Sequence, residues 1–215
     1  PNYNHALFLK QRIDSVLNQN FQDFELIILD DCSTDASREI IEQYRNHPKI
    51  SQIIYNDKNS GGVFKQWVKG IEKAKGEYIW IAESDDYAAE KFLAETLHVM
   101  EQDASIGMVF TNTNVVDPHG AFIETSAGSK AESYKQLAAF QNNIDVENAS
   151  QFLVSEMIIA NASSVLFRKT HLLTIDFTEL QKFVNTGDRF VYLGIALNSK
   201  IKYLPQPLNF MRSHE

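Results

Sequence analysis

Apolar residues recur along the first half of the chain with two alternating periods. Leu9, Ile13 and Val16 follow a helical spacing within residues 5–18, and the apolar run FELIILDD at 24–31 is typical of a buried strand that ends in a polar turn. This order of helix and strand repeats as far as residue 117. We expect further helices at about 35–44, 64–74 and 90–101, and further strands at 50–56, 77–82 and 106–112.

Helices that alternate with strands predict a three-layer α/β/α sandwich of the Rossmann-like kind, with a mainly parallel sheet. In such sheets ligands bind at the carboxyl ends of the strands. Three polar loops are expected at that edge: DDCSTD (30–35), NDKNSGG (56–62) and ESDD (83–86). The sequence therefore predicts a ligand cleft formed by these loops.

The pattern is less regular after Pro118. The stretch ETSAGSKAE at 124–132 is typical of an exposed flexible loop, and we interpret ETSAGSKAESY at 124–134 as a candidate mobile lid. Helices are expected near 133–141, 148–157 and 186–199, with strands at 162–169 and 201–205 and with Arg212 and His214 beyond the last strand. We therefore expect a ligand-binding half at 1–117 and a less regular half at 118–215.

Composition restricts the function. The chain has 215 residues, 44% of them hydrophobic, which suits one globular domain. Its net charge of -8 and the absence of a dense Lys/Arg tract argue against nucleic acid as a partner. No apolar run approaches the roughly 18 residues that a membrane span needs. The single cysteine, Cys32, cannot form an internal disulfide, which fits a reducing compartment.

The sequence GEYIWIAESDDY at 76–87 places three carboxylates, Glu83, Asp85 and Asp86, directly after a strand. Close like charges repel, so the cluster is costly unless a cation lies among them. Helix capping by Asp85 or Asp86 is the alternative, but capping needs only one carboxylate. Oxygen ligands favour hard cations, so we expect Mg²⁺ or Mn²⁺.

Each of the other candidate site residues has a possible functional role and a possible purely structural one. Asp30 ends a strand at the expected cleft, where its carboxylate could accept a hydrogen bond from a base or a ribose. Tyr3 is either a surface aromatic or a platform for a base. Gly61 allows close approach of backbone to a ligand, or simply makes a turn. Asp188 stands where an acidic residue stabilises a helix N-terminus whether or not it is catalytic.

Taken together, several stretches resemble the inverting family-2 glycosyltransferases of the GT-A type, which transfer a sugar from a nucleoside diphosphate. The similar stretches keep the family's order and cover nearly the whole chain. They are PNYN, VLNQNFQDFELIILDDCSTDAS, NSGGVFKQWVKGIEKAKGEYIWIAESDDY, GDRFVYLGIAL and PLNFMRSHE.

The resemblance implies a role for each matching residue. Asp30 and Tyr3 would contact the base, Glu83-Ser84-Asp85 would meet the ribose and the metal, and Asp188 would be the general base. The donor-binding set is then Pro1, Tyr3, Asp30, Asp31, Asn59, Gly61, Lys65, Glu83 and Ser84, and the metal set is Asp85, Asp86 and His214.

Several positions depart from the family's pattern. Glu83 stands where Asp is more usual, and Cys32 replaces a common glycine. Trp67 and Val68 occupy positions where many members have Arg-Asn, so the diphosphate contact supplied there is either absent or taken over by Lys65. The residues TG before Asp188 lack the acidic neighbour that is often found.

The implied activity is transfer of a sugar, with a UDP-linked donor expected, to a hydroxyl of a glycan or lipid-linked glycan, with inversion. A cytoplasmic location is expected, with peripheral association at the inner face of the membrane where the acceptor is membrane-bound. Two other classes stay open: a metal-dependent nucleotidyltransferase or phosphohydrolase, and a non-catalytic module that binds sugar nucleotides. The first would attack phosphorus rather than carbon.

Overall fold

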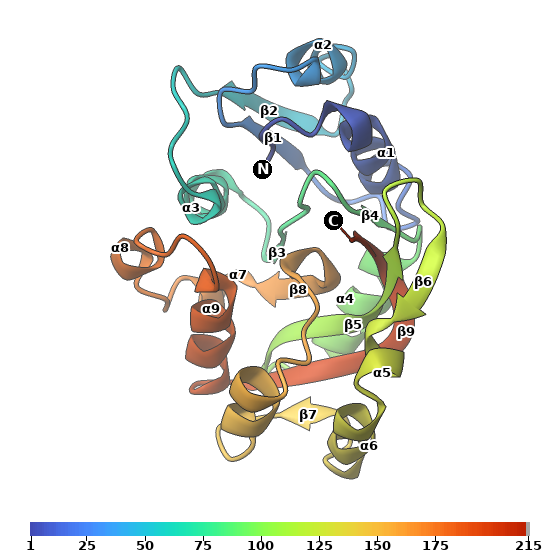
Figure 1. Ribbon diagram of the computed structural model, residues 1–215. Coiled ribbons are helices and arrows are strands. Elements are labelled where there is room, and N and C mark those ends of the chain that lie inside the picture. Colours follow the sequence, from blue (N-terminus) through green and yellow to red (C-terminus); the bar gives the residue numbers. More distant parts are fainter. Residues whose placement is uncertain (214–215) are drawn as a thin grey trace.

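The computed structural model describes residues 1–213 (Figure 1). The first half alternates helices and strands as the hydrophobic pattern predicts, with one additional short strand, β4, directly after the acidic cluster. Its elements are α1 (Ala6–Leu17), β1 (Leu26–Asp30), α2 (Ser37–Glu42), β2 (Ile50–Tyr55), α3 (Val63–Lys73), β3 (Tyr78–Trp80), β4 (Tyr87–Ala88), α4 (Phe92–Gln102) and β5 (Ile106–Val116).

The second half contains more regular structure than the sequence predicts. Its strands are β6 (Phe122–Thr125), β7 (Asn143–Ile144), β8 (Val165–Arg168) and β9 (Lys200–Arg212). Its helices are α5 (Ser126–Ser129), α6 (Ala131–Ala139), the π-helix Ser150–Ser155 (η1), the 3₁₀ turn Ala162–Ser164 (η2), α7 (Lys169–Leu172), α8 (Phe177–Leu180) and α9 (Gly187–Ala196).

Two sheets form instead of one mainly parallel sheet. β1 and β2 pair in parallel, as expected for strands joined by a helix. The larger sheet has the order β3-β8-β5-β9-β4, with β6 added to β5 and β7 added to β9. Only β5 and β9 are parallel in it, and every other pair of neighbouring strands in this sheet is antiparallel. The architecture is thus a mixed α/β fold.

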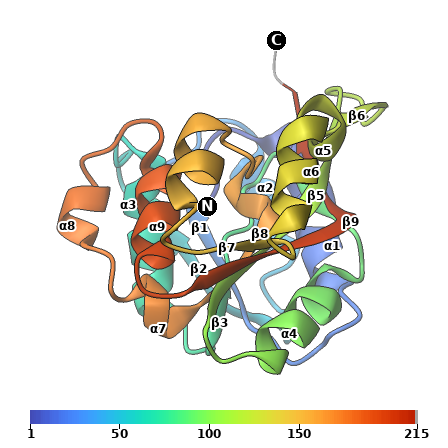
Figure 2. The same cartoon turned by 90° about the horizontal axis from the view of Figure 1, so that it is seen from below.

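Helices cover both faces of the larger sheet. Met108 and Phe110 of β5 belong to a core that includes residues of α3, α6 and α9, whereas Val109 points to the opposite face, where it packs with Phe92 and Met100 of α4. Figure 2 shows α4 on one side of β9 and α6 and α9 on the other. A separate core lies between the small sheet and the helices α1 and α2. The expected layering is present.

The predicted flexible loop at 124–132 was wrong. Thr125 caps α5 by accepting a hydrogen bond from the Gly128 amide at 2.9 Å. Ser126 is buried and donates to Oδ1 of Asn112 on β5 at 3.0 Å. A polar composition alone gave no sign of this buried asparagine, which ties the segment to the sheet. The segment is therefore not a free lid.

The last strand is longer than predicted and includes Arg212, which is buried rather than beyond the strand. Its guanidinium donates to the carbonyl of Pro118 at 3.1 Å and lies over the rings of Phe8 and Tyr87. Within residues 1–213, none of the helices has both the length and the apolar composition that a membrane span requires.

Candidate active site

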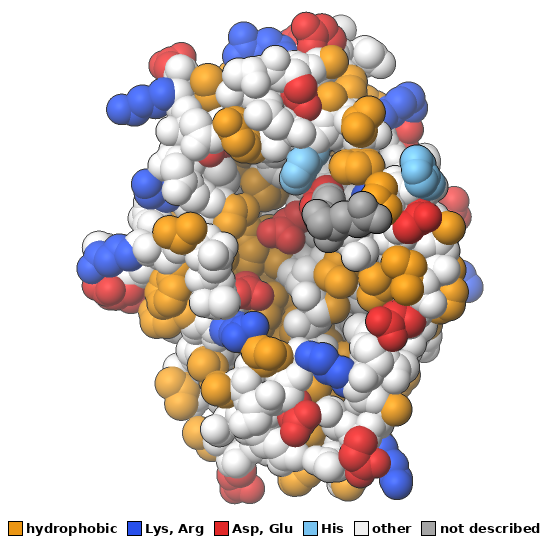
Figure 3. Space-filling view, viewed as in Figure 1, with side chains coloured by type: hydrophobic (Ala, Val, Ile, Leu, Met, Phe, Trp, Pro, Cys, Tyr) orange, Lys and Arg blue, Asp and Glu red, His pale blue; other side chains and the backbone are white. Residues whose placement is uncertain are grey.

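A pocket of about 380 Å³ opens where the loops after β1, β2 and β3 meet. Figure 3 shows the hollow in the middle of one face, with acidic side chains at its floor. Most of the residues that line it have polar side chains, and they come from four separate stretches of sequence: Pro1, Asn2, Tyr3, His5, Asp31, Asn59, Gly62, Val63, Gln66, Glu83, Ser84 and Asp85. Seven predicted site residues are therefore brought together: Pro1, Tyr3, Asp31, Asn59, Glu83, Ser84 and Asp85.

Five predicted residues within the described part of the chain do not line this pocket: Asp30, Gly61, Lys65, Asp86 and Asp188. Asp30 is only 1% exposed, and its carboxylate accepts hydrogen bonds from Asn2 at 2.8 Å and from the Ser33 hydroxyl at 2.6 Å and amide at 3.0 Å. These bonds join the first residues of the chain to the loop after β1. Asp30 thus supports the wall that carries Tyr3.

Asp31 organises a second wall of the pocket. Its carboxylate accepts from the side chain of Asn56 at 2.6 Å, from the amide and hydroxyl of Ser60 at 2.9 and 2.7 Å, and from Gln66 at 3.0 Å. One carboxylate therefore holds the loop 56–62 and the start of α3 in place. Lys65 is exposed and donates to the carbonyl of Ser60 at 2.7 Å, so it stands at the outer end of this loop.

The acidic cluster is fixed from several sides. The amide of Glu83 donates to the Ser163 hydroxyl at 3.1 Å, and the hydroxyl of Ser84 lies 2.8 Å from Nδ1 of His5. Asp86 is 3% exposed and accepts from Nδ2 of Asn161 at 2.5 Å and from the Arg212 amide at 3.2 Å, through different oxygens. Both oxygens of Asp86 are therefore engaged with the protein, and Asp85 is the aspartate that faces the pocket.

The cluster is electrostatically costly. Burial, together with the charges of Asp86 and Asp85, raises the pKa of Glu83 to about 8. Burial and the neighbouring Asp85 also raise the pKa of Asp86, which Arg12 opposes. A protonated carboxyl is the usual outcome when like charges meet away from water.

Arg12 on α1 is the residue that sequence reasoning missed. It is 2% exposed, and within the described residues its three guanidinium nitrogens make no hydrogen bond. The guanidinium lies 4.9 Å from the centre of the Trp80 ring, and burial lowers its pKa to about 10 despite the nearby charges of Asp86, Glu83 and Asp85. The available signal was an arginine on the apolar face of α1, beside Leu9 and Ile13.

The side chains of the site provide only some of the ligands that a divalent cation needs. Within residues 1–213 there is no group of three or more His, Cys, Asp or Glu side chains that could hold a metal. Mg²⁺ is commonly held by one or two carboxylates together with substrate phosphates and water. The oxygens of Asp85 fit that arrangement, with the remaining ligands supplied by a bound diphosphate. The predicted ligand His214 lies outside the described residues.

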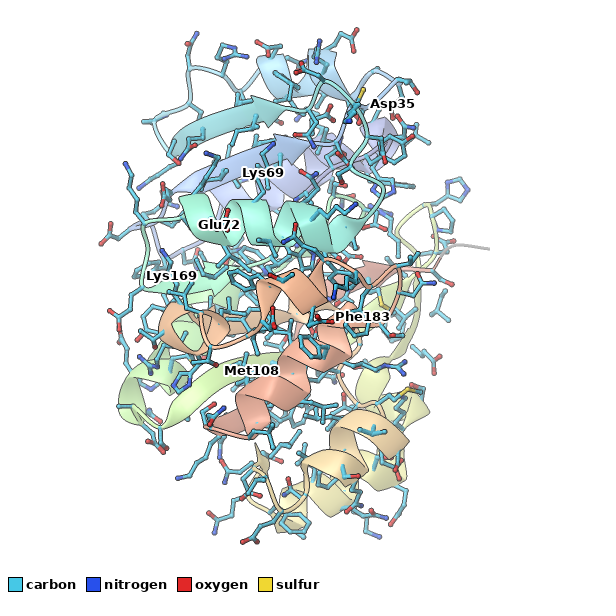
Figure 4. The ribbon with its side chains drawn as sticks, turned by 90° about the vertical axis from the view of Figure 1, so that its left-hand side faces the viewer. Asp35, Lys69, Glu72, Met108, Lys169 and Phe183 are labelled. Atoms are coloured by element: carbon cyan, nitrogen blue, oxygen red, sulfur yellow. The ribbon has the colours of Figure 1, made fainter. Side chains whose placement is uncertain are left out.

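Asp188 stands in the first turn of α9, and its charge contributes to the raised pKa of Glu83. Burial raises its pKa. Gly187 allows this position, because a Cβ atom there would lie 2.8 Å from the ring of Phe64 on α3. Figure 4 shows α3, with Lys69 and Glu72 labelled, above the helices that include α9. One turn after Asp188 is Tyr192, whose buried hydroxyl has no hydrogen bond within residues 1–213.

Comparison with known proteins identifies the family to which this α/β fold, with carboxylates at its strand ends, belongs. The family model "Glycosyl transferase family 2" matches residues 1–160. The chain belongs to that family.

Relatives and solved structures give further detail. An uncharacterized glycosyltransferase of Haemophilus influenzae is 34% identical over 168 residues, which are 78% of this chain and 63% of that protein. The poly(ribitol-phosphate) beta-N-acetylglucosaminyltransferase TarS of Staphylococcus aureus is 33% identical over 109 residues, or 49% of this chain and 18% of TarS. The chain thus spans less than two thirds of the length of these relatives.

The fold is also that of solved glycosyltransferases. The crystal structure of TarS residues 1–349 with UDP matches with a TM-score of 0.75 at 20% identity, over 99% of this chain and 59% of that one. The mannosyltransferase PcManGT of Pyrobaculum calidifontis, in complex with GDP-Man and Mn²⁺, matches with a TM-score of 0.67 at 17% identity, over 98% and 55%. The predicted GT-A-type fold is confirmed.

Proposed function

We propose that this chain transfers a sugar from a nucleoside diphosphate to a hydroxyl acceptor, with inversion at the anomeric carbon. One observation carries the proposal: a single pocket is lined by Tyr3, Asp31, Glu83 and Asp85, and the charge of Asp188 contributes to the raised pKa of Glu83. Inverting displacement needs a site for the departing diphosphate and a base for the incoming hydroxyl. The pocket offers a place for the diphosphate beside Asp85, and Asp188, which is not among the lining residues, is the candidate base.

The donor half of the site is the pocket itself. Tyr3 is 46% exposed at the pocket, so its ring is available to stack on a base. Asn59, Glu83 and Ser84 are the polar candidates for the ribose and the base. A UDP-linked donor is supported by the structural likeness to TarS, which was solved with UDP and with UDP-GlcNAc.

The diphosphate would lie beside Asp85. A Mg²⁺ or Mn²⁺ ion held by Asp85 and the diphosphate would supply Lewis-acid stabilisation of the leaving group. The likeness to PcManGT, solved with Mn²⁺, supports such an ion. The positive charge of the buried Arg12 would partly balance the negative charge of the carboxylates. Asp86 would hold the backbone segment that carries Asp85.

Asp188 would accept the proton of the acceptor hydroxyl as that hydroxyl attacks the anomeric carbon. Positioned general bases contribute roughly 10² to 10⁴-fold to a rate. A base needs a pKa near the working pH, and burial moves the pKa of Asp188 upward in that direction. Its position is fixed by the contact between Gly187 and Phe64.

The half of the chain after residue 117 would hold the acceptor, for which we propose a glycan or a lipid-linked glycan, and a role in making cell-surface polysaccharide. The similarity to TarS, a poly(ribitol-phosphate) beta-N-acetylglucosaminyltransferase, supports a polymeric acceptor. If the acceptor is lipid-linked, the enzyme would act at the inner face of the membrane.

The direct test is incubation with UDP-, GDP- and dTDP-sugars in the presence of Mn²⁺, with analysis of the products. We expect release of free nucleoside diphosphate from one donor, and loss of that release in Asp188→Asn. Release of nucleoside monophosphate and sugar phosphate would instead indicate attack at phosphorus. Binding of a donor without turnover by any acceptor, and with no effect of Asp188→Asn, would indicate a binding module.

A further inference from the structure

Two residues at the start of η2, in the second half of the chain, hold the acidic cluster of the first half at both of its ends. At one end, the hydroxyl of Ser163 accepts a hydrogen bond from the Glu83 amide at 3.1 Å. At the other end, Nδ2 of Asn161 donates to Oδ2 of Asp86 at 2.5 Å. Asp85 lies between the two held positions. We call Asn161 and Ser163 the clamp residues.

The backbone between the two held positions is a tight turn. The amide of Asp86 lies 3.4 Å from the carbonyl oxygen of Glu83, to which it donates. In a turn of four residues, fixing the first and the last leaves little freedom to the two in the middle. Asp85 is one of these two and lines the pocket, whereas Asp86 does not. The direction of the Asp85 carboxylate therefore depends on the contacts of its neighbours.

The clamp residues are themselves held in one orientation. Oδ1 of Asn161 accepts from Nδ2 of Asn209 on β9 at 3.0 Å, so its amide faces a donor on one side and the Asp86 carboxylate on the other. Ser163 is fully buried, and its carbonyl accepts from Nε1 of Trp80 at 2.8 Å. A side chain whose position is fixed in this way can fix the position of another group.

Repulsion within the cluster gives these contacts a purpose beyond joining the two halves. Glu83, Asp85 and Asp86 lie within four residues, and like charges repel at this range, so the turn would spread apart without groups that hold it. The clamp residues are neutral. They add no positive charge beside the cluster and leave the negative potential that attracts a cation. The clamp therefore fixes the turn without competing with the ion.

We propose that Asn161 and Ser163 are positioning residues for the divalent cation, because they hold Asp86 and Glu83 so that the Asp85 carboxylate is directed at the donor's diphosphate. Groups that orient a metal ligand through hydrogen bonds are commonly worth about 10 to 100-fold in metal affinity. The inference rests on the proposed function, which places the cation at Asp85. It adds to the donor site two residues from the half of the chain that would hold the acceptor.

The test measures the affinity of the whole chain for UDP by calorimetry, with and without Mn²⁺. The ratio of the two affinities is the Mn²⁺ effect. We expect this effect to be at least about tenfold in the unchanged protein and to disappear in Asp85→Asn. This first step tests the proposed function separately from the clamp.

Alanine variants then test the clamp. Asn161→Ala and Ser163→Ala should each reduce the Mn²⁺ effect by about tenfold. Neither should change the affinity for UDP without Mn²⁺, because neither side chain lines the pocket. Ser133→Ala is the matched control, since Ser133 is also a buried serine of the second half and donates to the Glu156 carboxylate at 2.6 Å. We expect the control to lose stability but to keep the full Mn²⁺ effect.

An exchange variant separates the hydrogen bond from a general loss of stability. Asn161→Asp alone sets two carboxylates against each other, and Asp86→Asn alone sets two amide groups against each other. Together they reverse donor and acceptor, so that the side chain at position 86 donates to the one at position 161. The outer partners, Asn209 and the amide of Arg212, still meet an acceptor oxygen. The double variant should recover most of the Mn²⁺ effect that each single variant loses.

Three results would overturn the inference. These are a full Mn²⁺ effect in either alanine variant, an equal loss of the effect in Ser133→Ala and Ser163→Ala, and no recovery in the exchange variant. If Asn161→Ala does not fold, Ser163→Ala and the exchange variant still decide. A failure of the proposed function would appear earlier, as an absence of UDP binding or of any Mn²⁺ effect in the unchanged protein.

Discussion

Asn161 donates a hydrogen bond from Nδ2 to Oδ2 of Asp86 at 2.5 Å, and so joins the second half of the chain to the acidic cluster of the first. The same asparagine accepts from Asn209 on β9 at 3.0 Å. Asp86 also accepts from the Arg212 amide. The cluster therefore contains one aspartate that supports the fold, Asp86, and one that faces the pocket, Asp85.

This division predicts opposite outcomes for two similar substitutions. Asp86→Asn replaces an acceptor oxygen by a donor in a buried network and should lower the free energy of unfolding by about 1–3 kcal/mol. Asp85→Asn should change stability less but should abolish the effect of Mn²⁺ on UDP affinity. Urea unfolding and calorimetry measure the two quantities. Equal stabilities of the two variants would contradict the division.

Arg12 should be necessary for stability. Arg12→Met keeps the apolar stem but leaves three carboxylates without their buried cation, and removal of one partner from such a group costs roughly 3–5 kcal/mol. Arg12→Lys retains the charge and should recover part of the loss. The measurement is the midpoint of urea unfolding at pH 7. A stable Arg12→Met variant would show that the guanidinium does not compensate the cluster.

The pH dependence of the reaction should reflect Asp188. Its pKa is raised by burial, and only the ionised carboxylate can accept the proton of the hydroxyl. Activity should therefore be complete above this pKa and should fall as the pH drops through it, at a higher pH than an exposed aspartate, with a pKa of about 4, would give. A profile of kcat/KM against pH locates the acid limb. An acid limb at or below the ordinary value would contradict this role.

Cys32 has a φ of 66°, which explains why glycine is common at this position in the resembling family. A non-glycine residue in this region costs about 1–2 kcal/mol, while glycine costs the unfolded chain about 0.5–1 kcal/mol in entropy. Cys32→Gly should therefore stabilise the protein by roughly 0.5–1 kcal/mol. Cys32→Ser keeps the Cβ atom and is the control. Thermal unfolding should show a gain for the glycine variant alone.

The spacing of apolar residues predicted those helices and strands that depend on local sequence. Residues 5–18 and 64–74 became α1 and α3, and the run at 24–31 became β1, because a one-sided apolar stripe or an apolar run must be buried against a neighbour. Of the strands in the second half, β8 and β9 were located, whereas the short strands β6 and β7 were not. The antiparallel pairing of β8 with β5 was also not predicted, because pairing partners lie far apart in sequence. The short strand β4 has only two residues and carries no period.

The sequence predicted many residues of the candidate site but not the interactions between them. Tyr3, Asp31 and Asp85 do meet at one pocket, as the strand-end rule requires. The rule could not tell that both oxygens of Asp86 bond to the protein, because Asn161 and Arg212 come from distant segments. The buried position of Arg12 was also hidden, since an arginine on a helix is usually exposed.

The central claim is that Asp85 holds a divalent cation together with a nucleoside diphosphate in the pocket. Calorimetric titration with UDP, GDP and dTDP, each with and without Mn²⁺, tests it most directly. We expect one nucleotide to bind, at least about tenfold more tightly with Mn²⁺ than without, and to lose this difference in Asp85→Asn. Failure of all three nucleotides to bind in excess Mn²⁺ or Mg²⁺ would contradict the account.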